Sequence, residues 1–208
     1  MTRIKICGVT SIEQALDCVA AGADSVGVNF VPSSPRRVDE ARARAIANAV
    51  GDRALVVGVV AGLDLQRMRA LRDATGVGCL QLHGDERPSD VEALLPHAYK
   101  AVRVGTAADV ERARTYRGEF LLVDARANGA LGGTGATFDW SLVVKLATER
   151  KLTLAGGLTP ENVGDAIRAV RPYCVDVASG VESAPGVKDL GRVRAFLAAA
   201  RTPDITPT

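Results

Sequence analysis

A cysteine and an aspartate stand where two strand-like segments of this sequence end, and both side chains can move protons. Cys7 ends segment 3–7, in which apolar and polar residues alternate, and Asp124 ends the apolar segment 120–124. A thiol and a carboxyl group are both ionisable, so each can exchange a proton with a bound ligand. Buried ionisable groups are costly unless they have partners or a purpose, so this pair predicts a functional site; the alternative is that polar residues simply cluster where strands meet loops.

Further polar side chains recur at alternate positions of the strand-like segments. Lys5 precedes Cys7 by two residues on the same face, roughly 6–7 Å along a strand, where its charge would favour the thiolate. Gln81 and His83 share one face of another segment, and Asp176 stands between two valines. For Gln81 and His83 the alternative is a structural, hydrogen-bonded role. The alternation predicts that these polar side chains point to the same interior.

Two glycine-bearing segment ends and one arginine supply groups that bind anions. Gly156 and Gly157 follow one apolar segment, and Ser179 and Gly180 follow the next. Glycine lets backbone N–H groups approach a ligand closely, so the two turns predict a phosphate site; the alternative is that they are only tight turns. Arg36, in a loop rich in serine and proline, could hold a carboxylate with two hydrogen bonds or lie in solvent.

The segments that must position these groups alternate between strands and helices. Periodicity predicts strands at 3–7, 25–30, 55–60, 79–83, 99–104, 120–124, 152–155 and 175–178. Helices are expected at 12–21, 39–50, 64–76 and 106–116, after 89, 139 and 159, and at 187–200. Capping boxes place two helix starts at Thr10 and Ser89, and Thr159 is expected to cap a helix that begins with a proline.

Eight strand–helix alternations at a spacing of roughly 25 residues predict an α/β fold, a single (β/α)8 TIM barrel. Its eight parallel strands would carry the active site at their carboxyl ends. The alternative is an open doubly wound sheet, which usually has fewer strands and a GxGxxG turn that this sequence lacks after its first strand. We expect one catalytic domain over 1–201 and a disordered tail over 202–208, which contains two prolines.

Composition and net charge limit which binding partners and which cellular compartment are expected. The net charge is +2 and the arginines are scattered, so the sequence gives no indication of nucleic-acid binding. No apolar run reaches membrane-spanning length and the N-terminus enters a strand at once, which predicts no membrane partner and a cytoplasmic protein. The four cysteines are far apart and lack the spacing of metal ligands.

Six motifs, taken in order, resemble the phosphoribosylanthranilate isomerase family, and the match spans nearly the whole chain except the tail. They are KICGVT (5–10), the loop 32–36, QLHG (81–84), the segment from Asp124 through GGTGATFDW (132–140), AGGLTPENV (155–163) and DVASGVE (176–182). The resemblance implies a (β/α)8 barrel that needs no cofactor and no metal. It implies an Amadori rearrangement in tryptophan biosynthesis, from N-(5-phosphoribosyl)anthranilate to 1-(2-carboxyphenylamino)-1-deoxyribulose 5-phosphate.

The resemblance also implies roles for individual residues. Cys7 would be the general base, Asp124 the general acid and Arg36 the contact to the anthranilate carboxylate. The remaining substrate-binding positions would be Gln81, His83, Gly156, Gly157, Ser179 and Gly180, supported by Lys5 and Asp176. The glycine-rich loop 129–135 is suited to closing over the sugar. The partner would be a small phosphosugar, bound by a monomer or a homodimer.

Two other functions stay open at this point. The sister isomerase of histidine biosynthesis takes a substrate with two phosphates and usually has an aspartate at the base position; Cys7 disfavours it, although dual specificity stays open. A non-catalytic phosphosugar-binding barrel is disfavoured by the presence of both Cys7 and Asp124. Barrel closure would also make the last strand the neighbour of the first. We therefore expect Lys5 and Asp176 to form a buried ion pair.

Overall fold

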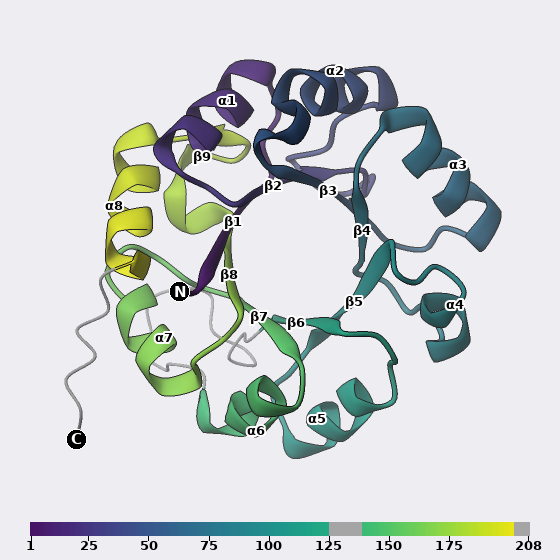
Figure 1. Ribbon diagram of the computed structural model, residues 1–208, viewed down its shortest axis with the longest axis vertical. Helices are drawn as coiled ribbons and strands as arrows, with labels where there is room; N and C mark the ends of the chain where they lie inside the picture. Colours follow the sequence, from purple (N-terminus) through teal and green to yellow (C-terminus); the bar gives the residue numbers. More distant parts are fainter. Residues whose placement is uncertain (125–138, 202–208) are drawn as a thin grey trace.

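Eight parallel strands form a closed barrel in the order of the chain, and helices surround it (Figure 1). The structure, a computed structural model, describes residues 1–124 and 139–201. Strand β1 pairs with both β2 and β8, which closes the ring. The predicted TIM barrel is therefore confirmed. The expectations for the loop 129–135 and the tail 202–208 concern residues outside the described part of the chain.

The barrel strands lie close to their predicted positions. They are β1 (Arg3–Cys7), β2 (Ser25–Asn29), β3 (Leu55–Val60), β4 (Cys79–Leu82), β5 (Ala98–Arg103), β6 (Phe120–Asp124), β7 (Lys151–Ala155) and β8 (Cys174–Val177). The α-helices are α1 (Ile12–Ala21), α2 (Glu40–Val50), α3 (Leu65–Thr75), α4 (Pro88–Glu92), α5 (Ala107–Arg114), α6 (Ser141–Glu149), α7 (Val163–Val170) and α8 (Leu190–Arg201). Short 3-10 turns, η1 (Gly51–Arg53) and η2 (Ser179–Val181), and a hairpin of β9 (Glu182–Ala184) and β10 (Val187–Lys188) complete the described elements.

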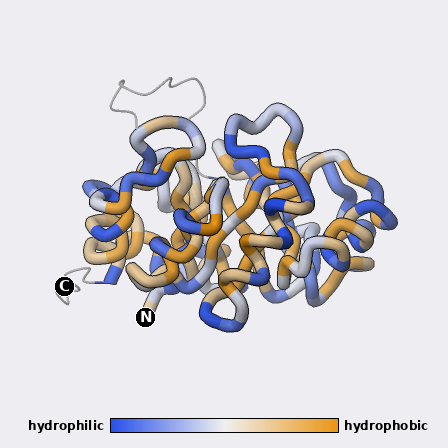
Figure 2. The backbone as a smooth tube through the Cα atoms, turned by 90° about the horizontal axis from the view of Figure 1, so that it is seen from above, coloured by the Kyte–Doolittle hydropathy of each residue, from blue (hydrophilic) through white to orange (hydrophobic). Residues whose placement is uncertain are grey.

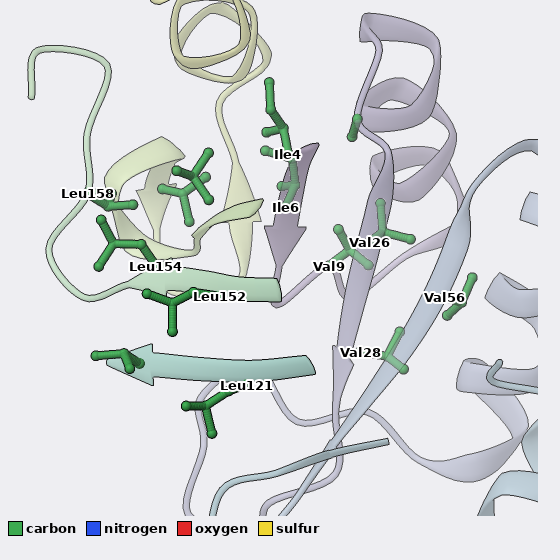
Figure 3. Packing of buried hydrophobic residues seen from close by; sticks show 14 of the residues in the cluster. Ile4, Ile6, Val9, Val26, Val28, Val56, Leu121, Leu152, Leu154 and Leu158 are labelled. Atoms are coloured by element: carbon green, nitrogen blue, oxygen red, sulfur yellow. The ribbon is translucent and has the colours of Figure 1, made fainter. Parts of the chain in front are cut away.

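Alternation of side chains along the strands divides the core into two layers. The larger layer lies between strands and helices and contains aliphatic side chains such as Ile4, Ile6 and Leu152 (Figure 3). Burying one such side chain contributes about 1.5–3 kcal/mol, so this layer holds the helices on the barrel. Coloured by hydropathy, the chain shows apolar stretches through its body and hydrophilic ones along its periphery (Figure 2).

The smaller apolar layer lies inside the barrel and leaves room for polar groups. Its members are Val57, Tyr99, Ala101, Leu122 and Ala155. The other inward positions of several strands carry buried polar side chains: Lys5, Ser25, Gln81, Asp124, Thr153 and Asp176. A barrel interior without polar function would be filled by branched aliphatic residues. The polar side chains in the barrel interior therefore indicate that these positions serve a function other than packing the core.

Helix starts that depend on one local side chain were predicted well at two places. Asp39 and Asp64 cap α2 and α3, and each carboxylate accepts a hydrogen bond from the backbone N–H three residues on. At α1 the prediction was wrong by one residue. Ser11 is the cap and accepts from the N–H of Gln14, while the Thr10 hydroxyl donates to the carbonyl of Gly186. The hydroxyl that was expected to cap the helix therefore bonds the distant β9–β10 hairpin instead.

Three other predicted helix starts were wrong as well. Helix α4 begins at Pro88, so Ser89 lies inside it, because proline fits the first helical position. Before α7, the backbone N–H of Thr159 donates to the Asn162 side chain in a turn, and the helix begins only at Val163. The last helix begins at Leu190 rather than 187, because residues 182–188 form the β9–β10 hairpin. This hairpin lies at the carboxyl end of β8 and contributes to the site described next.

Candidate active site

One cavity of about 160 Å³ lies at the carboxyl ends of the strands. The predicted site residues that line it are Cys7, Arg36, Gln81, His83, Asp124, Gly156, Gly157, Asp176, Ser179 and Gly180. Lys5 is the predicted residue that lies outside this lining, and it contacts two of the lining residues from within the barrel. Side chains from distant parts of the sequence therefore meet where a (β/α)8 barrel carries its active site.

Lys5 and Asp176 form the expected buried ion pair. The β1–β8 register places them side by side, and Lys5 Nζ lies 2.9 Å from Asp176 Oδ2. Their side chains are only 2% and 6% exposed. Burial alone would lower the pKa of Lys5, but the charge and hydrogen bond of Asp176, together with Cys7 and Tyr99, outweigh burial, so this pKa lies well above its ordinary value. Lys5 Nζ also donates to Gln81 Oε1 at 3.0 Å. The ammonium is thus held charged in the interior.

The thiol of Cys7 lies close to Gly27, on the side where any other residue would carry its Cβ. Sequence reasoning did not single out Gly27. A Cβ at position 27 would stand 2.7 Å from Cys7 Sγ and 3.1 Å from Lys5 Nζ, so only glycine leaves room for both groups. Burial raises the pKa of Cys7, and the charge of Lys5 opposes it. Burial wins, and the pKa lies above its ordinary value of 9.0. Lys5 lowers the pKa of Cys7, as expected, but in the absence of ligand the thiol keeps its proton at neutral pH.

A chain of polar contacts runs from Gln81 toward Asp124. Tyr99, on the neighbouring strand, donates its hydroxyl to Gln81 Oε1 at 3.0 Å, and Gln81 Nε2 lies 3.3 Å from His83 Nδ1. His83 Nε2 stands 3.8 Å from Asp124 Oδ2. Burial lowers the pKa of His83, and the nearby Asp124 only partly offsets this. With Gln81 donating to Nδ1, a neutral His83 carries its proton on Nε2, facing Asp124.

Two turns, after β7 and after β8, form a backbone cradle at one side of the cavity. Within the described part of the chain, the backbone N–H groups of Gly156, Gly157, Ser179 and Gly180 donate to no protein acceptor. The turns approach each other so closely that a Cβ on Gly180 would overlap the carbonyl oxygen of Leu158. Unpaired N–H groups next to a cavity suit an anion.

Arg36 lines the cavity at the carboxyl side of β2 and is held by a carboxylate that sequence reasoning missed. Its Nε lies 2.8 Å from Glu182 Oε1 and its Nη2 lies 2.5 Å from Glu182 Oε2. Lys188 Nζ lies 2.8 Å from Glu182 Oε1. Glu182 ends the motif DVASGVE, but nothing in the sequence shows which loop it meets 146 positions away.

Fold and site together define a class of protein. Among residues 1–124 and 139–201, no group of three or more His, Cys, Asp or Glu side chains is placed to hold a metal ion. The cavity instead combines a thiol, a carboxyl group, an anion cradle and a guanidinium. The protein is a (β/α)8 barrel whose cavity offers groups suited to binding a small anion and to exchanging protons with it.

The chain belongs to the N-(5'-phosphoribosyl)anthranilate isomerase family, since the family model described as N-(5'phosphoribosyl)anthranilate (PRA) isomerase matches residues 4–199. A protein of that name from Pseudomonas aeruginosa (strain LESB58) is 47% identical over 202 residues, which are 96% of this chain and 95% of the relative. Another, from Myxococcus xanthus (strain DK1622), is 46% identical over 205 residues and covers 96% of each chain.

Solved structures agree with this assignment. A crystal structure of phosphoribosyl anthranilate isomerase from Thermotoga maritima superposes with a TM-score of 0.88 at 38% identity, covering 97% of this chain and 99% of that one. A crystal structure of the same kind of enzyme in complex with reduced 1-(o-carboxyphenylamino)-1-deoxyribulose 5-phosphate gives a TM-score of 0.86 at 37% identity, with the same coverage. The family resemblance expected from the six motifs is therefore confirmed.

Proposed function

We propose that this chain converts N-(5'-phosphoribosyl)anthranilate to 1-(2-carboxyphenylamino)-1-deoxyribulose 5-phosphate, the Amadori rearrangement of tryptophan biosynthesis. One observation carries the proposal. The Cys7 thiol and the Asp124 carboxyl group, from β1 and β6, line the same cavity as an unpaired backbone cradle and a guanidinium. Family membership over residues 4–199 supports the same reaction.

The substrate has two anionic ends, and the cavity offers a group for each. We assign the phosphate to the N–H groups after β7 and β8, which have no protein acceptor among the described residues. We assign the anthranilate carboxylate to Arg36, because a planar guanidinium can hold a carboxylate with two parallel hydrogen bonds. Between these ends the ribose would lie beside Cys7 and Asp124.

Ring opening begins the reaction. Asp124 delivers a proton to the ribose ring oxygen, the C1′–O bond breaks, and the nitrogen lone pair forms the C1′=N iminium. Asp124 is 4% exposed, so this part of the cavity holds the reacting ribose away from bulk water. The Nε2–H of His83, 3.8 Å away, faces the carboxylate that remains. We assign His83, with Gln81 behind it, to orienting this carboxyl group.

Removal of the C2′ proton follows, and Cys7 is the proposed base. Its raised pKa means that the free enzyme holds a thiol, so this proton must pass to solvent before the sulfur can act as the base. A substrate iminium next to the sulfur adds a positive charge to that of Lys5, and both favour the thiolate. The thiolate takes the C2′ proton, giving an enaminol. Return of a proton to C1′ and loss of the hydroxyl proton give the aminoketose product.

The reaction sets the expected partner and compartment. The phosphosugar substrate is the proposed partner, and we infer a cytoplasmic location because all four cysteines are free thiols, as is usual in a reducing compartment. The part of the chain that the structure describes includes no helix long and apolar enough to cross a membrane. Both a monomer and a homodimer are compatible with a cavity lined by one chain.

Genetic complementation tests the proposal. Expressed in a bacterial strain that lacks its own isomerase for this step, the chain should restore growth without tryptophan, and Cys7→Ser and Asp124→Asn should not. Expression in a strain that lacks the corresponding histidine-pathway isomerase separates the two activities, and we expect no growth there. A soluble, folded chain that leaves the tryptophan auxotroph without growth would contradict the proposed function.

A further inference from the structure

Within residues 1–124 and 139–201, the guanidinium of Arg36 uses one of its two hydrogen-bonding edges. Its Nε and Nη2 donate to the two carboxylate oxygens of Glu182, at 2.8 and 2.5 Å. This is the side edge of the fork. The end edge, formed by Nη1 and the second hydrogen of Nη2, stays available for another carboxylate. Arg36 is 20% exposed and lines the cavity, whereas the Glu182 side chain is 4% exposed.

Glu182 is itself fixed by the β9–β10 hairpin. Lys188 Nζ, on β10, lies 2.8 Å from Glu182 Oε1 and also donates to the carbonyl of Ala178 at 3.1 Å. The backbone N–H of Gly186, in the hairpin turn, donates to the same carboxylate oxygen at 3.3 Å. Burial alone would raise the pKa of Glu182, but Arg36 and Lys188 outweigh it and hold this pKa below its ordinary value. Glu182 is therefore ionised at neutral pH.

Lys188 determines the net charge of the group formed by Arg36, Glu182 and Lys188. A carboxylate next to Arg36 would by itself cancel the charge that attracts an anionic substrate. With Lys188 included, two cations share one anion, so the group keeps a net positive charge facing the cavity. The Arg36 stem is also confined, because it crosses the backbone of Gly8, directly after Cys7, where a Cβ would overlap Arg36 Cδ.

We propose that Glu182 is a positioning residue, which holds the side edge of Arg36 and presents its end edge to the anthranilate carboxylate of the substrate. The proposal rests on the proposed function, because it assumes that carboxylate as the ligand. Glu182 touches no reacting atom and acts through Arg36. The β9–β10 hairpin thus belongs to the substrate-recognition apparatus, although it lies outside the barrel.

Glu182→Gln tests this with little change in volume. The amide offers one acceptor instead of two and turns an NH2 toward a donor, so Arg36 loses its fixed orientation. We expect KM to rise about tenfold with kcat within about twofold, because the carboxylate contact is made in ground state and transition state alike. The Kd for inorganic phosphate, which occupies the other end of the site, should not change. Glu149→Gln is the matched control, since Glu149 makes a similar two-point contact with Arg114, which is half-buried and does not line the cavity.

A double-mutant cycle with Arg36→Met separates positioning from general damage. If Glu182 acts through Arg36, adding Glu182→Gln to Arg36→Met should raise KM by less than about twofold more. Glu182→Asp keeps the charge but is one methylene shorter, so its KM should lie between those of the parent and Glu182→Gln. It also serves as the test if Glu182→Gln does not fold.

Four results with Glu182→Gln would overturn the proposal: an unchanged KM, a lowered KM, an equal loss of phosphate affinity, or additive effects in the cycle with Arg36→Met. A lowered KM would mean that Glu182 competes with the substrate for Arg36. An unchanged KM in Glu182→Asp would count against it equally. Turnover by the parent protein keeps the two proposals apart, because an inactive parent contradicts the proposed function, whereas an active parent with an unaltered Glu182→Gln contradicts only the positioning role.

Discussion

Replacing Lys5 by methionine removes the buried ammonium and keeps most of its stem. Lys5 Nζ stands 2.9 Å from Asp176 Oδ2, and both side chains are almost fully buried. Removing one partner of such a pair leaves an uncompensated buried charge and costs roughly 3–5 kcal/mol. Gln81 loses a donor as well, about 1 kcal/mol more. Domains of this kind have unfolding free energies of roughly 5–15 kcal/mol, so the variant should be markedly less stable.

Urea unfolding at equilibrium measures this loss, provided that the transition is two-state. Lys145→Met makes the same substitution at an exposed position on α6 and should change the unfolding free energy by less than about 0.5 kcal/mol. Asp176→Asn should also be destabilising. The combination of Lys5→Met with Asp176→Asn removes both charges, so it should cost at least about 1 kcal/mol less than the sum of the single variants.

The pH dependence has a defined sign. Because the pKa of Lys5 is raised above its ordinary value of 10.5, its stabilising contribution is complete below that pH and is lost as the pH rises through the folded-state pKa. The stability difference between parent and Lys5→Met should therefore stay constant from neutral pH to about pH 10. Additive single variants, or a Lys5→Met protein as stable as Lys145→Met, would refute the account of the pair.

The remaining predictions concern the cavity. Cys7→Ser and Asp124→Asn should each lower kcat by about 10²–10⁴-fold while urea unfolding changes little, and near-full turnover in either would contradict its assigned role. Arg36→Met should weaken binding of reduced 1-(o-carboxyphenylamino)-1-deoxyribulose 5-phosphate but not of inorganic phosphate. Equal weakening of both would place Arg36 at the phosphate end of the substrate. Iodoacetamide should alkylate Cys7 in the ligand-free protein with a midpoint above pH 9.0, because burial raises the pKa of the thiol. In Lys5→Met the midpoint should move higher still, and an unshifted profile would show that Lys5 does not act on the sulfur.

The positions of the strands and the inward polar set could be predicted from the sequence because both depend on short periods. Alternation placed Lys5 with Cys7 and Gln81 with His83, and closure of the barrel placed Lys5 beside Asp176. Each of these predictions uses only the two-residue repeat of a strand and the order of strands in a (β/α)8 barrel. The structure adds the distances and the cavity that these side chains share.

Features that depend on contacts far apart in the sequence could not be predicted. Thr10 has the sequence context of a helix cap, but its hydroxyl bonds the hairpin at Gly186. Glu182 and Lys188 have the composition of a surface hairpin, and their burial follows only from this hairpin meeting the loop that carries Arg36. The pKa of Cys7 likewise depended on which of two opposing effects is larger. Burial raises this pKa more than the charge of Lys5 lowers it, and the extent to which a thiol is buried cannot be read from the sequence.

Steady-state turnover of N-(5'-phosphoribosyl)anthranilate by the purified chain tests the central claim most directly. The protein is dialysed against EDTA, and loss of substrate is followed together with formation of the aminoketose, with Cys7→Ser measured in parallel. The account predicts rapid turnover, with kcat on the order of 1–10³ s⁻¹, that needs no added metal and is nearly absent in Cys7→Ser. Substrate loss no faster than the spontaneous rate, or turnover that survives in Cys7→Ser, would contradict it.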